Sequence, residues 1–202
     1  MKRWLTALAV VGVLMGPSWA APEGKETATF AGGCFWCTEA VFQELNGVDE
    51  VVAGMMGGQD EGLTAEQIAK GQGGHAEVIT LTYDPKVIDY SELLEVFFAT
   101  HDPTSVNKQG ADEGIEYRSE VFTYSDAQKA TAEEIIAEMT EQKIYPKPIV
   151  TKVTPATVFH PAAEKHQNYY TKNSDPQYCQ MVITPKVEKF RKIFADKLKK
   201  KT

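Results

Sequence analysis

Strand-like and helix-like patterns alternate along this chain, and this alternation limits its possible folds more than any other feature. In "HAEVITLTYDP", Glu77 shares one strand face with the apolar residues Ile79 and Leu81, and a Pro turn ends the run. The next segment, "YSELLEVFFATH", has apolar residues at helical spacing, with Asp89 and Glu92 placed as a capping box. Interleaving of this kind predicts an α/β fold, a mixed sheet covered by helices in two layers.

Similar signals place the other elements. Further strands are expected at residues 26–32, 48–56, 117–124 and 148–156. Further helices are expected at residues 34–45, from Thr64, from Ser125 to about Lys143, and around Tyr169 and Phe190. No linker divides the pattern, so residues 21–202 are interpreted as a single domain.

The first twenty residues have the composition of a secretory signal peptide. Lys2 and Arg3 precede an apolar run over residues 5–15, and Ser18 and Ala20 are spaced like a cleavage site. The run is too short for a membrane anchor, so we expect removal of residues 1–20 and no stable membrane insertion afterwards. The mature protein would then act outside the cytoplasm, in the periplasm if the cell has one.

Charge argues against one class of partner. The formal net charge is −7 and the sequence has no basic stripe, so nucleic acid is not expected to bind.

The three cysteines are too few for a disulfide framework and leave one thiol over. Cys34 and Cys37 enclose two aromatic residues where a Gly pair gives way to the first helix. A thiol in a first helical turn is favoured as thiolate, which marks Cys34 as a nucleophile. A zinc site of Cys34, Cys37 and His166 has too few ligands for a structural site, so no metal is expected.

Phe35 and Trp36 lie between these cysteines. They fit the walls of a small apolar pocket beside the sulfur, although core packing is the more common reason for aromatic residues at a helix start.

Two polar groups are further candidates. A carboxyl group at Glu77 among apolar residues would have a raised pKa and donate protons near neutrality, but pairing with an Arg or exposure at the strand end is equally compatible. In "VNKQGADEGIEYRS", Asp112 and Glu116 crowd near Arg118, with Tyr117 between charged residues. That loop either orients a polar substrate group or is a solvated turn, and the residues alone favour the turn.

Several segments in order resemble the A-type peptide methionine sulfoxide reductases: "GGCFWCTEAVFQ", "GMMGG", "GHAEVITLTYDP", "FFATHDPTSVNKQGADEGIEYRS", "HQNYY" and "YCQMVITPK". The resemblance spans essentially all of the mature chain. It implies a ferredoxin-like two-layer fold with a long C-terminal segment. It also implies reduction of methionine S-sulfoxide, free or in proteins, without a metal or organic cofactor.

Individual residues of this chain match positions that have assigned roles in the family. The resemblance implies that Cys34 is the nucleophile and Glu77 the proton donor. Phe35 and Trp36 match the pocket for the substrate methyl group, and Asp112 and Tyr117 match the polar site partners.

A second thiol must then condense with a Cys34 sulfenic acid, and a thioredoxin-like dithiol protein would reduce the disulfide. We expect Cys179 to be this resolving thiol, as the C-terminal cysteine is in the relatives it resembles, because "NSDPQYCQ" looks like a mobile stretch. Cys37 is its rival or a relay. The expected role is repair of oxidised exported proteins.

One position departs from the family, and two other functions stay open. Met55 stands where the family commonly has a tyrosine, and a thioether cannot donate a hydrogen bond. "CFWC" alone also fits thioredoxin-like thiol–disulfide exchange through Cys34 and Cys37. A non-catalytic methionine- or peptide-binding module would use the aromatic pocket without an acid at Glu77.

Overall fold

The computed structural model describes residues 21–172 and 176–200. The predicted signal peptide, residues 1–20, lies outside this part. Within it, no helix has both the length and the apolar character needed to cross a membrane.

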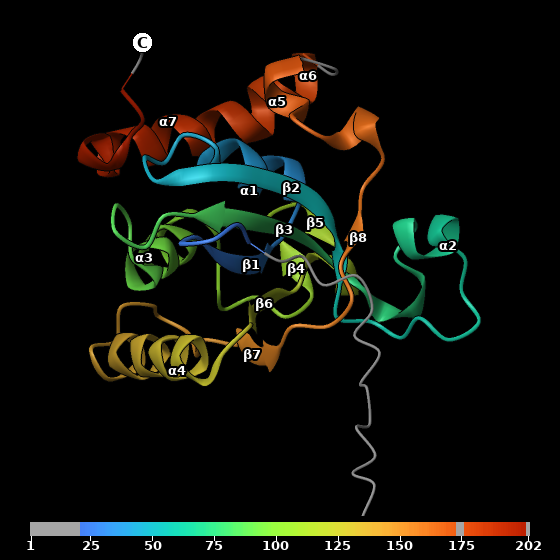
Figure 1. Ribbon diagram of the computed structural model, residues 1–202, viewed down its shortest axis with the longest axis horizontal. Coiled ribbons are helices and arrows are strands. Elements are labelled where there is room, and N and C mark those ends of the chain that lie inside the picture. The colour runs from blue at the N-terminus through green and yellow to red at the C-terminus, as the bar shows by residue number, and fades with distance from the viewer. Residues whose placement is uncertain (1–20, 173–175, 201–202) are drawn as a thin grey trace, which may run out of the picture.

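A six-stranded mixed sheet forms the centre of the molecule (Figure 1), with the strand order β7-β6-β1-β3-β2-β8. The strands are β1 (Glu26–Gly32), β2 (Val48–Met56), β3 (Ala76–Tyr83), β6 (Ser119–Thr123), β7 (Lys152–Pro155) and β8 (His160–Pro161). All neighbouring pairs are antiparallel except β6 and β7, which are parallel. A separate hairpin joins β4 (Lys108–Gln109) to β5 (Asp112–Glu113).

Helices pack against this sheet and against one another. They are α1 (Phe35–Phe42), α2 (Ala65–Ala69), α3 (Tyr90–Thr100), α4 (Asp126–Glu141), α5 (Tyr169–Lys172), α6 (Pro176–Tyr178) and α7 (Thr184–Ile193). Shorter turns are η1 (Gln72–Gly74), η2 (Ile115–Tyr117), η3 (Glu164–His166), the π-helix η4 (Cys179–Ile183) and η5 (Ala195–Lys197). α1 contacts β2 and β3, α3 contacts β1, α4 contacts β6 and β7, and α7 lies against α1 and α3.

The core lies between the helices and the sheet. The ring of Phe30 on β1 lies 5.4 Å from that of Phe42 on α1 and 5.1 Å from that of Phe97 on α3. Ile79 and Leu81 of β3 belong to the same fully buried cluster. On the opposite face, a smaller cluster around Val78 is covered by Phe159, in the chain between β7 and β8. The predicted two-layer α/β architecture is confirmed.

Most of the expected elements are present, with different ends. Residues 117–118 are not part of a strand, because the chain turns through η2 before β6 begins at Ser119. The strand expected at 148–156 is shorter, and the following β8 was not expected. The helix expected at 34–45 ends at Phe42.

Candidate active site

The turn between β1 and α1 positions the first cysteine. Gly33 has φ of +87°, and a Cβ there would lie 2.4 Å from Cγ of Gln109, so only glycine fits. Cys34 is the N-cap of α1, and its carbonyl oxygen accepts from the amides of Cys37 (3.1 Å) and Thr38 (3.3 Å). The chain therefore turns at Gly33, directly before the helix that begins after Cys34.

Glu77 lies beside this turn. Its Oε2 accepts a hydrogen bond of 2.9 Å from the amide of Phe35, one of the amides that the start of α1 leaves without a helical partner. Burial raises the pKa of Glu77 to about 8, the charge of Cys34 adds to the shift, and the bond from Phe35 opposes it. Arg118 pairs with Glu120 instead, at 2.5 Å. Of the alternatives left open for Glu77, the structure fits a partly buried carboxyl group with a raised pKa, and not a carboxylate paired with an arginine.

The two cysteines of "CFWC" form a buried pair. Their thiols are hydrogen-bonded, and this bond, followed by burial, raises the pKa of Cys34. The same bond, with help from the charge of Lys186 and against the effect of burial, lowers the pKa of Cys37. The sequence predicted a lowered pKa at Cys34. That prediction is wrong for this closed pair, because it ignored a second thiol one turn along the helix, which holds the charge more readily.

Tyr178, a residue that the sequence reasoning missed, closes over the pair. Its hydroxyl group hydrogen-bonds with the thiols of Cys34 and Cys37. Burial and the nearby thiols raise the pKa of Tyr178, so the phenol stays protonated and donates. Tyr178 and Lys186 both come from "YCQMVITPK", which indicated the family but gave no sign of which side chains face the site.

The two aromatic residues differ in their surroundings. Phe35 is buried in the core cluster, so core packing describes it, while Trp36 is half-buried at the edge of that cluster. The rings of Trp36 and Tyr169 stack at 3.7 Å, and Tyr178 meets Trp36 edge-on at 5.6 Å. Trp36 Nε1 has no hydrogen-bond partner in the described residues. Trp36 thus forms a wall of stacked rings next to the thiols.

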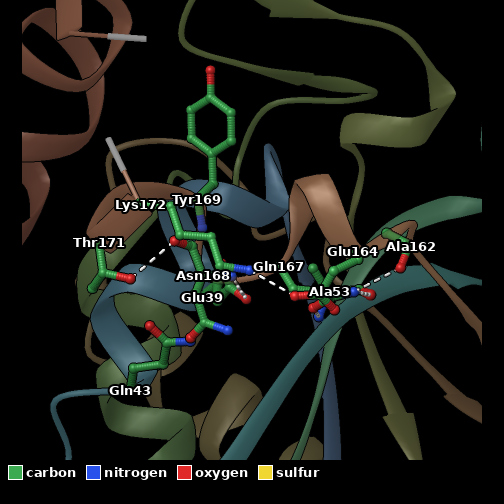
Figure 2. Close-up of polar contacts among 10 residues, drawn as sticks. All are labelled: Glu39, Gln43, Ala53, Ala162, Glu164, Gln167, Asn168, Tyr169, Thr171 and Lys172. Carbon is green, nitrogen blue, oxygen red and sulfur yellow. Dashed lines mark hydrogen bonds and ion pairs between the residues drawn. The ribbon is translucent and has the colours of Figure 1, made fainter. Parts of the chain in front are cut away.

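Figure 2 shows what holds that wall in place. Glu39, buried on α1, accepts hydrogen bonds from the amides of Asn168 (2.8 Å) and Tyr169 (3.2 Å). Gln167 accepts from the amide of Ala53 (2.9 Å) and donates to its carbonyl oxygen (2.8 Å), so it continues the edge of β2. These bonds fix the segment "HQNYY" against α1 and β2.

Asp112 and Tyr117 lie near Glu77. Burial and then the charge of Glu77 raise the pKa of Tyr117 to about 12, so its hydroxyl group is a donor. The charge of Asp112 contributes to the raised pKa of Glu77. Both side chains are half-buried, so the solvated turn that the residues favoured is wrong for these two positions. The expected crowding against Arg118 is also wrong, since this guanidinium binds Glu120 and backbone carbonyl groups.

Cys179 was expected in a mobile stretch, "NSDPQYCQ". Residues 173–175 of that stretch lie outside the described part, but Cys179 itself is helical and buried, so the expectation is wrong for this residue. It begins η4, directly after Tyr178, and is 4% exposed. α1 contacts η4, so Cys179 is close to the helix that carries Cys34 and Cys37, and all three cysteines are free.

A different group of residues is close enough to hold a metal ion. Within residues 21–172 and 176–200 it consists of Asp60, His75 and His160, and includes neither His166 nor any cysteine.

Comparison with known proteins decides the family. The sequence model described as "Peptide methionine sulfoxide reductase" matches residues 26–198. The chain belongs to the peptide methionine sulfoxide reductase family. This reductase is 49% identical over 175 residues to the peptide methionine sulfoxide reductase MsrA of Deinococcus radiodurans, covering 87% of this chain and 85% of that protein. It is therefore an oxidoreductase that acts on methionine sulfoxide.

Solved structures agree with this assignment. The reductase is similar to the reduced form of Mxr1 from Saccharomyces cerevisiae, with a TM-score of 0.70, 35% identity, and coverage of 77% of this chain and 88% of that chain. A structure of Mxr1 in complex with Trx2 matches with a TM-score of 0.53 and 27% identity, covering 78% of this chain and 94% of that one.

Proposed function

We propose that this reductase converts the S epimer of methionine sulfoxide, free or in proteins, to methionine through Cys34. The proposal is based on one hydrogen bond between the start of α1 and the strand β3. The amide of Phe35 donates to Glu77, and Phe35 directly follows Cys34, so the carboxyl group and the thiol face one site.

The first step transfers oxygen between sulfur atoms. The proton of Cys34 passes along the hydrogen bond to Cys37, and the Cys34 thiolate attacks the sulfur of the sulfoxide. Glu77 protonates the sulfoxide oxygen, to which Tyr117 donates a hydrogen bond. The protonated oxygen then passes from the methionine sulfur to the Cys34 sulfur as the new bond between the two sulfur atoms breaks. Methionine leaves, and Cys34 becomes a sulfenic acid. Trp36 forms the apolar wall beside the methyl group.

The second step forms a disulfide. A thiol condenses with the Cys34 sulfenic acid and releases water. We propose Cys179 as this thiol, with Cys37 as rival or relay. Because Cys37 already contacts Cys34, it is the rival for disulfide formation before any rearrangement. Cys179 directly follows Tyr178 in the chain, so a movement of Tyr178 away from the two thiols would also move Cys179.

A dithiol protein then restores the reductase. The structure of Mxr1 with Trx2 supports a thioredoxin-like reductant for this chain too. Together with the signal-peptide composition of residues 1–20, this makes the proposed role the repair of oxidised exported proteins outside the cytoplasm. The proposal includes neither a nucleic-acid partner nor a membrane anchor.

Single-turnover reduction of the two separated sulfoxide epimers, without added reductant, tests the activity. We expect stoichiometric conversion of the S epimer alone. Cys34→Ser should abolish it, whereas the matched variant Cys179→Ser should keep the first turnover. Disulfide exchange with full loss of sulfoxide reduction would favour the thioredoxin-like alternative. Binding of methionine without turnover would favour a binding module.

A further inference from the structure

A second polar cluster lies at the sheet edge, where β2 and β8 pair. Asp60 comes from the loop after β2, His75 directly precedes β3, and His160 begins β8. Oδ1 of Asp60 lies 2.7 Å from Nε2 of His75 and 3.0 Å from Nε2 of His160. One ligand atom from each residue lies within 4.8 Å of the others.

The hydrogen bonds of His75 fix which of its ring nitrogens faces Asp60. Its Nδ1 lies 2.9 Å from the carbonyl oxygen of Gln72, which can only accept, so Nδ1 carries a hydrogen. Nε2 lies 2.7 Å from Oδ1 of Asp60. In the tautomer with hydrogen on Nδ1 alone, the lone pairs of Nε2 and Oδ1 converge on one position, where a cation can bind.

The surroundings of His75 match those of a metal ligand. A backbone carbonyl that holds Nδ1–H and aims Nε2 at a metal is the usual outer-shell arrangement for histidine. The ring is buried and packs closely on Gly58, where a Cβ would lie 2.3 Å from its Nδ1. Asp60 is exposed and His160 is partly exposed, so these two can adjust around an ion.

We propose that Asp60, His75 and His160 bind a divalent transition-metal ion of the zinc type. Two imidazole nitrogens and one carboxylate oxygen are donors that Zn²⁺ accepts, and the exposed side of the cluster leaves a fourth position for water. Ligand atoms around tetrahedral zinc lie roughly 3.3 Å apart. The distances from Oδ1 of Asp60 to the two histidine nitrogens, 2.7 and 3.0 Å, therefore have to lengthen by a few tenths of an ångström. The bound ion joins three segments that are distant in sequence.

Zinc binding to the tag-free mature chain tests this site. Because thiols also bind zinc, the measurement uses the protein with Cys34→Ser, Cys37→Ser and Cys179→Ser, titrated with Zn²⁺ alone by calorimetry. We expect one ion per chain and a rise in melting temperature. Asp60→Asn or His160→Asn should weaken binding at least tenfold, since even outer-shell partners of zinc contribute about 10–100-fold.

Glu61→Gln is the matched control, because Glu61 is the exposed carboxylate next to Asp60 and should leave zinc affinity unchanged. Failure to bind zinc, or equal affinity in all of these variants, would overturn the proposal. So would an NMR signature of doubly protonated His75 at neutral pH in a protein that binds no zinc. None of these results depends on sulfoxide reduction.

Discussion

At the scale of single residues, the carboxyl group of Glu77 lies beside Cys34, where the proposed reaction needs an acid. Because its Oε2 accepts from the amide of Phe35, it is held beside Cys34 and not free to turn into solvent. We expect Glu77→Gln to slow single-turnover reduction by about 10²–10⁴-fold, the usual contribution of general acid catalysis, with little change in substrate binding.

The control for this variant is Glu113→Gln. Glu113 is an exposed carboxylate that pairs with Lys108, and its removal should leave the rate within a few-fold of the original. A Glu77→Gln enzyme with an unchanged single-turnover rate would remove this residue from the mechanism.

Met55 is directly opposite Glu77 in the β2–β3 register, and it is buried. A side chain here is close to the acid, because paired residues of antiparallel strands have Cβ atoms about 4.5–5.5 Å apart. We expect Met55→Tyr to accelerate reduction by up to about tenfold, as one neutral hydrogen bond contributes about 0.5–1.5 kcal/mol. Rapid-quench measurement on both epimers checks the rate and an unchanged epimer preference.

Met55→Phe supplies the ring without the hydroxyl group and should give no acceleration. Equal rates for Met55→Tyr and Met55→Phe would show that Tyr117 or Tyr178 already provides the donor.

At the scale of elements, the sequence predicted helix starts and strand faces, because both depend on residues close together in the chain. The capping boxes at Thr64 and Asp89 are both present, because each needs only the residue three positions on. The alternation of β3 predicted that Glu77 faces the helix layer, because side-chain direction along a strand has a period of two.

What the sequence did not show depends on contacts between distant segments. Tyr178 comes close to the thiols by packing edge-on against Trp36 of α1, 142 residues earlier in the sequence. Cys179 is helical, although the Pro and Asn nearby suggested a mobile stretch. The strand β8 consists of two residues, too few for a period to be recognised. The lowered pKa of Cys37 could not be predicted, because the sequence does not show that Lys186 lies near this thiol.

The C-terminal segment carries its own prediction, about which thiol resolves Cys34. We expect Cys179→Ser to delay the disulfide after one turnover and to leave Cys34 as a sulfenic acid that a trapping reagent captures. Mass spectrometry of the trapped protein checks this. The matched variant Cys37→Ser should still form a disulfide between Cys34 and Cys179. A bond between Cys34 and Cys37 that forms at the normal rate in Cys179→Ser would overturn the assignment.

At the scale of the whole molecule, His101 couples stability to pH. Its Nδ1 donates to the carbonyl oxygen of Phe97 (2.6 Å), and Ser119 donates to its Nε2 (2.7 Å). Burial lowers the pKa of His101 to about 4, against about 6.5 in an unfolded chain. The unfolded state therefore binds more protons between these values. Stability is full above pH 6.5 and falls by up to about 1.4 kcal/mol per pH unit as pH drops toward 4.

Urea unfolding between pH 4 and pH 7, with the thiols kept reduced, measures this slope. His101→Asn keeps a donor for Phe97 and has no group that titrates, so its free energy of unfolding should depend less on pH over this range. Parallel curves for the two proteins would show that His101 is not responsible.

The bonds from Asn168 and Tyr169 to Glu39 also set an order of folding. They cross 129 and 130 residues of sequence, so a chain still being synthesised has a charged carboxyl group on α1 and nothing to bind it. Burying that charge alone is costly, so we expect α1 to dock fully only after residues 168 and 169 have been made. We expect ribosome-bound fragments that end before residue 167 to remain open, which would suit the export that we propose for this protein.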